Sequence, residues 1–245
     1  MLTLIAHDRR RFMIGRLLPI EWAMVCLMAL AWGTLQARVS TEFAGEAGMA
    51  ELLARAPYDF IFTTVVPLIG IVNCGIRLGW DYTQGIAKYE LMSGFPRIQV
   101  LAAHAIFLAA STLGTVTVAA LGYLAAPVLA GRSGDVASSA AGALVVASLT
   151  AWAGSLPLYG VLLLVAVVAS SLEVIVVVGL GLLALSGGIN ALVGGSAWLL
   201  PTVFMLRPVS SLANSLPGAV IAALVVAVGS TAASLRLWSR KDILR

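Results

Sequence analysis

The sequence predicts an all-α integral membrane protein with six transmembrane helices, and three observations support this fold class. Of its 245 residues, 60% are hydrophobic and 11% are charged. The mean hydropathy is +1.01, and soluble globular domains carry roughly 25% charged residues. Long stretches without Asp, Glu, Lys or Arg fill most of the chain. Basic residues gather in the segments that a six-span topology places on one side of the membrane.

The uncharged runs determine how many spans are expected. Four runs are longer than the ~20 residues that a helix needs to cross a bilayer. They are 98–131, 136–172, 174–206 and 208–235. Two shorter runs, 22–37 and 60–76, also suffice if Glu21 and Asp59 lie at the interface. The expected spans are therefore about 19–37, 58–76, 98–126, 140–169, 174–192 and 217–235.

The distribution of Lys and Arg predicts that both termini are cytoplasmic, because these residues are enriched in cytoplasmic loops. In this orientation only four basic residues lie outside: Arg38, Arg55, Arg132 and Arg207. The other 11 of the 15 lie inside: Arg9, Arg10, Arg11, Arg16, Arg77, Lys88, Arg97, Arg236, Arg240, Lys241 and Arg245. The net charge of +4 is therefore a signal of topology, and nucleic acid is not an expected partner.

The N-terminal part of the chain leads from a basic segment into the first span. Residues 1–18 combine four arginines with apolar side chains, which is typical of a segment at the cytoplasmic interface. The first span begins at Pro19 and ends near Ala37. The charged stretch from Arg38 to Tyr58 is compatible with a short surface helix outside the membrane.

The second span, 58–76, contains two residues that disturb an apolar helix, Pro67 and Asn73. Pro67 removes one backbone hydrogen bond, and Asn73 brings an amide into the apolar layer, where a polar group without a partner is costly. Two interpretations of Asn73 stay open. It forms an interhelical hydrogen bond, or it is part of a substrate path.

The segment from Asp81 to Arg97, DYTQGIAKYELMSGFPR, is polar and separates two long apolar runs. Asp81 is a suitable helix N-cap, whereas Gly94 and Pro96 supply a stop. An apolar stripe at helical spacing predicts a short amphipathic helix over 82–92 that lies across the membrane surface. The stripe consists of Tyr82, Ile86, Tyr89 and Met92.

The third and fourth spans are each predicted to be one long helix. His104 lies in the third span without a second His, Cys or acid at ligand spacing, so we do not expect a metal site. Residues 140–172 are too few for two spans and a turn, and predict a single helix kinked near Gly154 and Pro157. Glu173 then lies in a tight inner turn, where a carboxylate is readily hydrated.

The last third of the chain contains an irregular outer segment. Residues 194–216 include several glycines and prolines and do not fit a simple crossing. Non-helical backbone at membrane depth occurs only where protein or water covers it, so this segment is predicted to be partly re-entrant. Within it, Arg207 either reaches lipid head groups or meets an anionic substrate. After the sixth span, Trp238 is expected to be an interfacial anchor.

The segment from Asp81 to Arg97 resembles the loop between the second and third spans of type-2 ATP-binding-cassette (ABC) permeases, the membrane halves of many bacterial exporters. The shared pattern is D-x-x-x-G-x-x-K, an apolar residue, and then G-aromatic-P-R. Its residues here are Asp81, Gly85, Lys88, Leu91, Gly94 and Arg97. Through length and six-span topology the resemblance covers essentially the whole chain. It is nearest to the branch for export of, and immunity to, bacitracin and other antimicrobial peptides.

The resemblance implies a single permease domain over 1–245 in the bacterial inner (plasma) membrane. Residues 1–18 would be its elbow helix and 82–92 its coupling helix, which contacts a separate ABC ATPase subunit. In this role Tyr82, Ile86, Tyr89 and Met92 would fill an apolar groove on the ATPase, and Asp81 and Lys88 would fix the register at its rim. Arg97 and Glu173 are further candidate ATPase contacts. A second permease copy or a related permease would complete a dimer, surrounded by membrane lipids.

The energy source follows from what the sequence lacks. It has no G-x-x-x-x-G-K-[ST] loop and no catalytic motif, so ATP and Mg²⁺ would be bound by the partner ATPase, and no cofactor is expected in this chain. Transporters driven by protons or sodium usually keep ionisable groups within the membrane, and few are expected here. The resemblance then implies an exporter of an amphipathic, peptide, drug or lipid-like substrate. Its alternatives are a non-transporting scaffold or sensor partner of an ATPase and a stand-alone lipid-handling enzyme.

Overall fold

The computed structural model describes residues 17–55, 61–80, 91–92, 94–129, 134–193 and 216–240. In these residues the regular secondary structure is helical and no strand occurs, which confirms the all-α fold class. Three predicted features fall almost wholly outside the described residues: the elbow helix 1–18, the coupling helix 82–92 except for residues 91–92, and the re-entrant segment 194–216 with Arg207.

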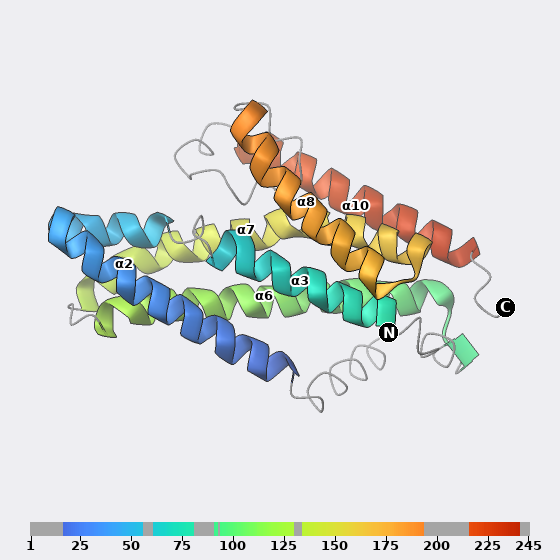
Figure 1. The fold of residues 1–245 in the computed structure, drawn as a ribbon, viewed down its shortest axis with the longest axis horizontal. Helices are drawn as coiled ribbons and strands as arrows, with labels where there is room; N and C mark the ends of the chain where they lie inside the picture. Colours follow the sequence, from blue (N-terminus) through green and yellow to red (C-terminus); the bar gives the residue numbers. More distant parts are fainter. Residues whose placement is uncertain are drawn as a thin grey trace.

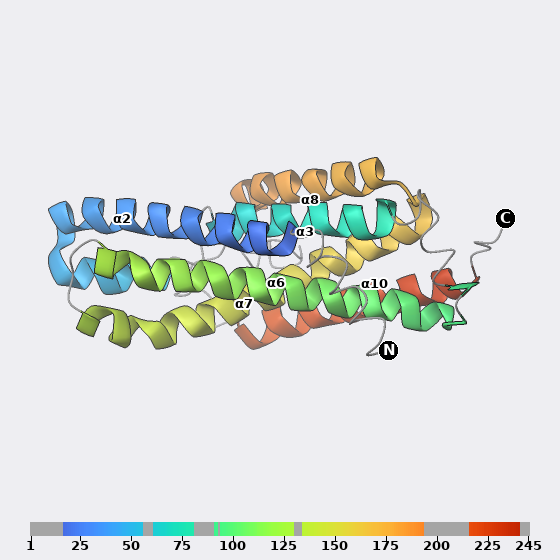
Figure 2. The same cartoon turned by 90° about the horizontal axis from the view of Figure 1, so that it is seen from below.

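The helices are arranged lengthwise in an elongated bundle (Figures 1 and 2). In chain order they are α2 (Leu17–Arg55), η2 (Ile61–Val65), α3 (Val66–Cys74), η3 (Gly75–Trp80), α6 (Arg97–Leu129), α7 (Gly134–Ala169), α8 (Leu172–Val193) and α10 (Leu216–Arg240). The two η segments are π-helical and extend α3 at both ends.

Within the described residues, three helical stretches are long and apolar enough to cross a membrane. They are Leu17–Arg38, Arg97–Ala126 and Ala151–Ala169. Two further apolar helices, Val66–Gly79 and Leu172–Leu185, are shorter. The chain is thus compatible with a multi-pass membrane protein.

Helices α2 and α6 lie side by side and run in the same direction. Small residues allow this close approach: Gly114 of α6 faces the ring of Trp22, and a Cβ added at Gly122 would lie 2.8 Å from the carbonyl oxygen of Cys26. Further along, Gly33 of α2 faces Tyr123 and Ala126 of α6. The residue numbers of the contacting positions increase in the same direction along both helices, so the two helices are parallel.

Helix α3 with its η3 extension runs antiparallel to α8. Near the middle of the pair Ile71 faces Gly179, and at its end Gly79 faces Leu172, the first residue of α8. Trp80, the last residue of η3, is thus close to the start of α8. The start of α6, the start of α8 and the end of α10 all lie towards one end of the bundle, which we name the Arg97 end (Figures 1 and 2).

Two helices differ from their predicted extents. The sequence predicts that the first span ends near Ala37 and that a separate surface helix follows. The structure instead has one helix, α2, up to Arg55, which turns back sharply (Figures 1 and 2). Helix α7 is single, as predicted, and holds Pro157 in its interior, but it starts at Gly134. The turn after it comprises only Ser170 and Ser171. Glu173, which is predicted to lie in this turn, belongs to the first turn of α8.

The Arg97 end of the bundle is held together by a large apolar cluster. Its members come from six packed elements and include Ile71 of α3, Leu78 of η3, Leu101 of α6, Leu162 of α7, Ile175 of α8 and Trp238 of α10. We name it the Trp238 cluster, since this tryptophan is only 2% exposed. The expectation that Trp238 is an interfacial anchor is therefore wrong: its ring is part of the core.

Candidate functional site

The link between the predicted coupling helix and α6 is packed against α6 itself. Leu91 and Phe95 pack on Val100 and Ala103, which lie in the first two turns of α6. Between them Gly94 has a φ of +88°, a conformation that favours glycine. Its N–H donates a hydrogen bond to the carbonyl of Leu91 at 3.3 Å. The turn therefore fixes Leu91 relative to α6.

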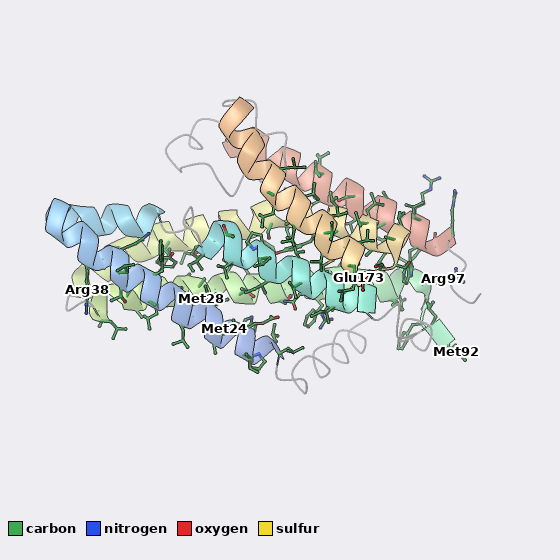
Figure 3. The ribbon with its side chains drawn as sticks, in the orientation of Figure 1. Met24, Met28, Arg38, Met92, Arg97 and Glu173 are labelled. Carbon is green, nitrogen blue, oxygen red and sulfur yellow. The ribbon has the colours of Figure 1, made fainter. Side chains whose placement is uncertain are left out.

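Met92 projects from this link at the extreme Arg97 end of the bundle (Figure 3). Its side chain is 71% exposed, whereas its neighbour Leu91 is half-buried against α6. Methionine is polarizable and adaptable, which suits a surface that binds an apolar groove. Arg97 is partly buried at the start of α6, close to the same end. The other proposed coupling residues lie outside the described residues: Asp81, Tyr82, Ile86, Lys88 and Tyr89.

Glu173 is an exposed carboxylate in the first turn of α8, also towards the Arg97 end (Figure 3). The hydroxyl of Ser171 donates a hydrogen bond to its Oε2. This hydrogen bond, with a smaller contribution from the backbone N–H of Glu173, holds the pKa of the carboxyl below its usual value of 4.5. A negative charge at a helix N-terminus is favourable. Glu173 thus presents a stable charge that a basic partner surface could meet.

Replacing Ser171 with Ala is expected to raise the pKa of Glu173 towards its usual value, because the charged form loses its main hydrogen-bond donor. The measurement is a pH titration by NMR of ¹³C-labelled glutamate, with the Glu173→Gln variant identifying the signal. Ser239→Ala is the matched control, since the Ser239 hydroxyl donates to the carbonyl of Arg236 and not to a carboxylate. An equal shift in both variants would show that Ser171 has no special effect.

Asn73 forms an interhelical hydrogen bond. Its side chain is 4% exposed, and its Nδ2 donates to Oε2 of Glu21 at 3.1 Å, across 52 residues of sequence. The structure thus supports the first of the two interpretations of Asn73, a polar contact between α2 and α3. Arg207, the other substrate-path candidate, lies outside the described residues.

Arg77 lies in the protein interior and does not have the exposed cytoplasmic position that its charge predicts. It is 2% exposed, and its guanidinium carbon lies 3.4 Å from the ring centroid of Phe107 on α6. It also attracts the carboxylate of Glu21 electrostatically. We name Glu21, Asn73, Arg77 and Phe107 the polar node. It corrects the expectation of very few ionisable groups between the helices, since Glu21 and Arg77 both lie in apolar helices.

Sequence reasoning missed the polar node, although one signal pointed to it. Asn73 and Arg77 are four residues apart and so lie on one helix face, and Glu21 lies within a candidate membrane-spanning stretch. His104 on α6 is also buried, at 4% exposure. Among the residues that the structure describes, no group of three or more His, Cys, Asp or Glu side chains could hold a metal ion.

Comparisons of the chain with protein-family models, with curated proteins and with solved structures gave no match. Its function has therefore to be inferred from its own residues and their geometry.

Proposed function

We propose that the chain is the membrane-spanning permease subunit of an ATP-driven ABC exporter of the bacterial inner membrane. It has six transmembrane helices and cytoplasmic termini, and pairs with a second permease. It moves an amphipathic, peptide, drug or lipid-like substrate outward, and a separate ATPase binds ATP and Mg²⁺. The observation that carries the proposal is Met92, an apolar side chain that is 71% exposed on a link packed against α6.

The directions of the helices support the six-span topology. Helices α2 and α6 are parallel, as expected for the first and third spans, which both run outward. Helix α3 is antiparallel to α8, as expected for the second span, which runs inward, and the fifth, which runs outward. The Arg97 end carries Arg97, Arg236 and Arg240 at helix termini, and basic residues favour the cytoplasmic side. This end is therefore the cytoplasmic one, and Met92 faces the compartment in which ATP is bound.

The packing of the link supports a mechanical role for residues 82–92. Leu91 and Phe95 are packed on the first turns of α6, so a push on the coupling helix reaches α6 directly. Helix α6 packs extensively along α2, with glycines at the contact. Packed helix interfaces change between discrete arrangements and do not deform continuously. Closure of the ATPase dimer would thus displace α6 and α2 together.

The test is whether charge placed on the apolar stripe releases the ATPase. Tyr89→Asp and Met92→Asp are each expected to lower the ATPase recovered with the affinity-tagged chain at least tenfold, because a buried carboxylate without a partner is costly in an apolar groove. Recovery is measured by mass spectrometry of proteins with a G-x-x-x-x-G-K-[ST] loop, purified from native membranes. The chain itself should keep its elution volume and its melting temperature.

Ser239→Asp is the matched control, since it adds the same charge at an exposed position near the end of α10. Full ATPase recovery with this variant and loss with Met92→Asp would support the coupling role. Undiminished recovery in both stripe variants would contradict it. Where the ATPase binds but none of a panel of amphipathic peptides changes its rate, the scaffold or sensor alternative is favoured over export.

A further inference from the structure

We propose that the polar node is a clamp that makes the start of α2 and the α3–η3 helix move as one unit. We name residues 81–96, which connect η3 to α6, the coupling segment. The inference rests on the proposed function for its consequence, because the clamp would carry motion from residues 82–92 into the first span. Its positioning residues are Glu21, Asn73 and Arg77. None of them is required to touch ATP, the ATPase or a substrate.

The clamp joins helices that otherwise have different principal neighbours. Helix α2 packs mainly against α6 and α7, whereas η3 packs mainly against α8 and α3 contacts α8 as well as α6 and α7. The hydrogen bond from Asn73 to Glu21 connects the two groups. Arg77 adds a second connection, since it lies on the Phe107 ring of α6 and attracts Glu21 of α2. One node therefore ties three helices together.

The surroundings of the node resist its separation. Leu18 and Trp22, which flank Glu21 on α2, pack against Phe107. The ring that the Arg77 guanidinium contacts is therefore itself packed against α2. Asn73 and Arg77 are both nearly inaccessible to solvent. If α3 moved without α2, an amide, a carboxylate and a guanidinium would be left without their partners in a low-dielectric region, which is strongly unfavourable. Joint movement avoids this cost.

The place of the node in the chain gives it a mechanical consequence. Arg77 belongs to η3, whose last residue, Trp80, directly precedes the coupling segment. A displacement of that segment thus reaches Arg77 within one helical turn. It then reaches Glu21 through the attraction between Arg77 and Glu21. η3 is π-helical, and π-helical turns are rare and often found at functional sites. The node thus connects the end of η3 to the start of α2.

The clamp itself is tested on the purified chain in lipid nanodiscs, without an ATPase. The variants are Glu21→Met, Asn73→Leu and the two combined, and the readout is the midpoint of thermal unfolding. The double variant is expected to unfold only slightly below Glu21→Met alone, because the second change removes a partner of a bond already lost. Additive shifts would overturn the clamp. Glu21→Gln, which keeps an acceptor oxygen for Asn73, should be shifted less than Glu21→Met. If Glu21→Met does not fold, Glu21→Ala replaces it in the cycle.

Thr34→Val supplies the matched control for the cycle. The Thr34 hydroxyl donates to the carbonyl of Leu30 within α2, so it does not connect two helices. Its shift should add to that of Asn73→Leu. Non-additivity of the same size in this control pair would also overturn the clamp, because it would show a general effect of lost polar groups.

Transmission is tested in the complex with its ATPase. A spin label is placed at Leu35→Cys, an exposed position on α2, after replacement of Cys26 and Cys74 by Ala. ATP with vanadate is expected to change the label's spectrum in the otherwise wild-type complex, and Asn73→Leu to reduce the change at least threefold while the ATPase stays bound. A full-sized change in Asn73→Leu would overturn transmission through the node. Loss of the ATPase from the wild-type chain would contradict the proposed function alone, and the double-variant cycle would still decide the clamp.

Discussion

Gly79→Ala is expected to remove most of the folded protein, because no space exists for a methyl group between η3 and the start of α8. A Cβ at this position would overlap the backbone nitrogen and Cα of Leu172 and would lie 2.9 Å from its Cβ. Backbone atoms at a helix start cannot rotate away as a flexible side chain can. Overpacking commonly costs 1–3 kcal/mol, and we expect a destabilisation of about 3 kcal/mol or more here.

The measurement compares the yield of monodisperse protein and its melting temperature in detergent with those of Gly181→Ala. Gly181 is also a glycine of an apolar helix, but nothing lies within 4 Å of a Cβ placed there. Since Ala is a better helix former than Gly by about 1 kcal/mol, the control should be neutral or slightly stabilised. A Gly79→Ala protein with the yield and melting temperature of the control would show that η3 and α8 are not in the close contact described.

The destabilising effect of Gly79→Ala would also bear on the proposed function. The contact with Leu172 places the last turn of η3 beside the turn that carries Glu173. The end of η3, which directly precedes the proposed coupling helix, is thus packed against the start of α8, the other region that the proposal assigns to the ATPase. A permease that receives force at two points needs them to be fixed relative to each other.

The helices could be predicted from the sequence because their determinants are local. Uncharged runs of helical length predicted α6, α7 and α8 close to their observed bounds. The reason is that a single apolar segment in a bilayer satisfies its own backbone hydrogen bonds only as a helix. The stop at the end of the coupling segment was equally local: Gly94 adopts the positive φ that a helix C-terminus favours, and Pro96 precedes the first turn of α6. For the candidate site, the sequence thus predicted where the segment ends. The apolar stripe that includes Met92 stays a prediction, because Tyr82, Ile86 and Tyr89 lie outside the described residues.

What could not be predicted depends on pairs of residues far apart in the sequence. Glu21 precedes Asn73 by 52 residues, and although Asn73 and Arg77 share a helix face, neither local sequence identifies Glu21 as their partner. Arg77 was assigned to solvent by a rule that counts charges in loops and cannot detect an aromatic ring from another helix. The same limitation applies to the bend of α2, because the charged residues after Arg38 favour a surface location and do not require that the helix stops.

The burial of Trp238 is the clearest case of such a non-local determinant, and it leads to the second large expected effect. A tryptophan beside Arg236 and Arg240 at the end of an apolar helix has the composition of an interfacial anchor. Its ring instead fills the Trp238 cluster, to which η3, α6, α7 and α8 contribute. Position relative to these helices, and not the neighbouring residues, decides its environment.

Trp238→Ala is therefore expected to destabilise the chain by about 3–5 kcal/mol, the range for removing a large aromatic side chain from a packed core. The ring is 2% exposed, and the helices around it cannot close the space without moving η3 or α6, the two elements that flank the coupling segment. Trp32→Ala is the matched control, because it deletes the same side chain from α2 at a position that is 37% exposed. The melting temperatures of the two variants in lipid nanodiscs provide the comparison. If Trp238 were an interfacial anchor after all, both substitutions would lower the melting temperature by similar, small amounts; a loss several times larger for Trp238→Ala places the tryptophan in the core that holds the coupling end together.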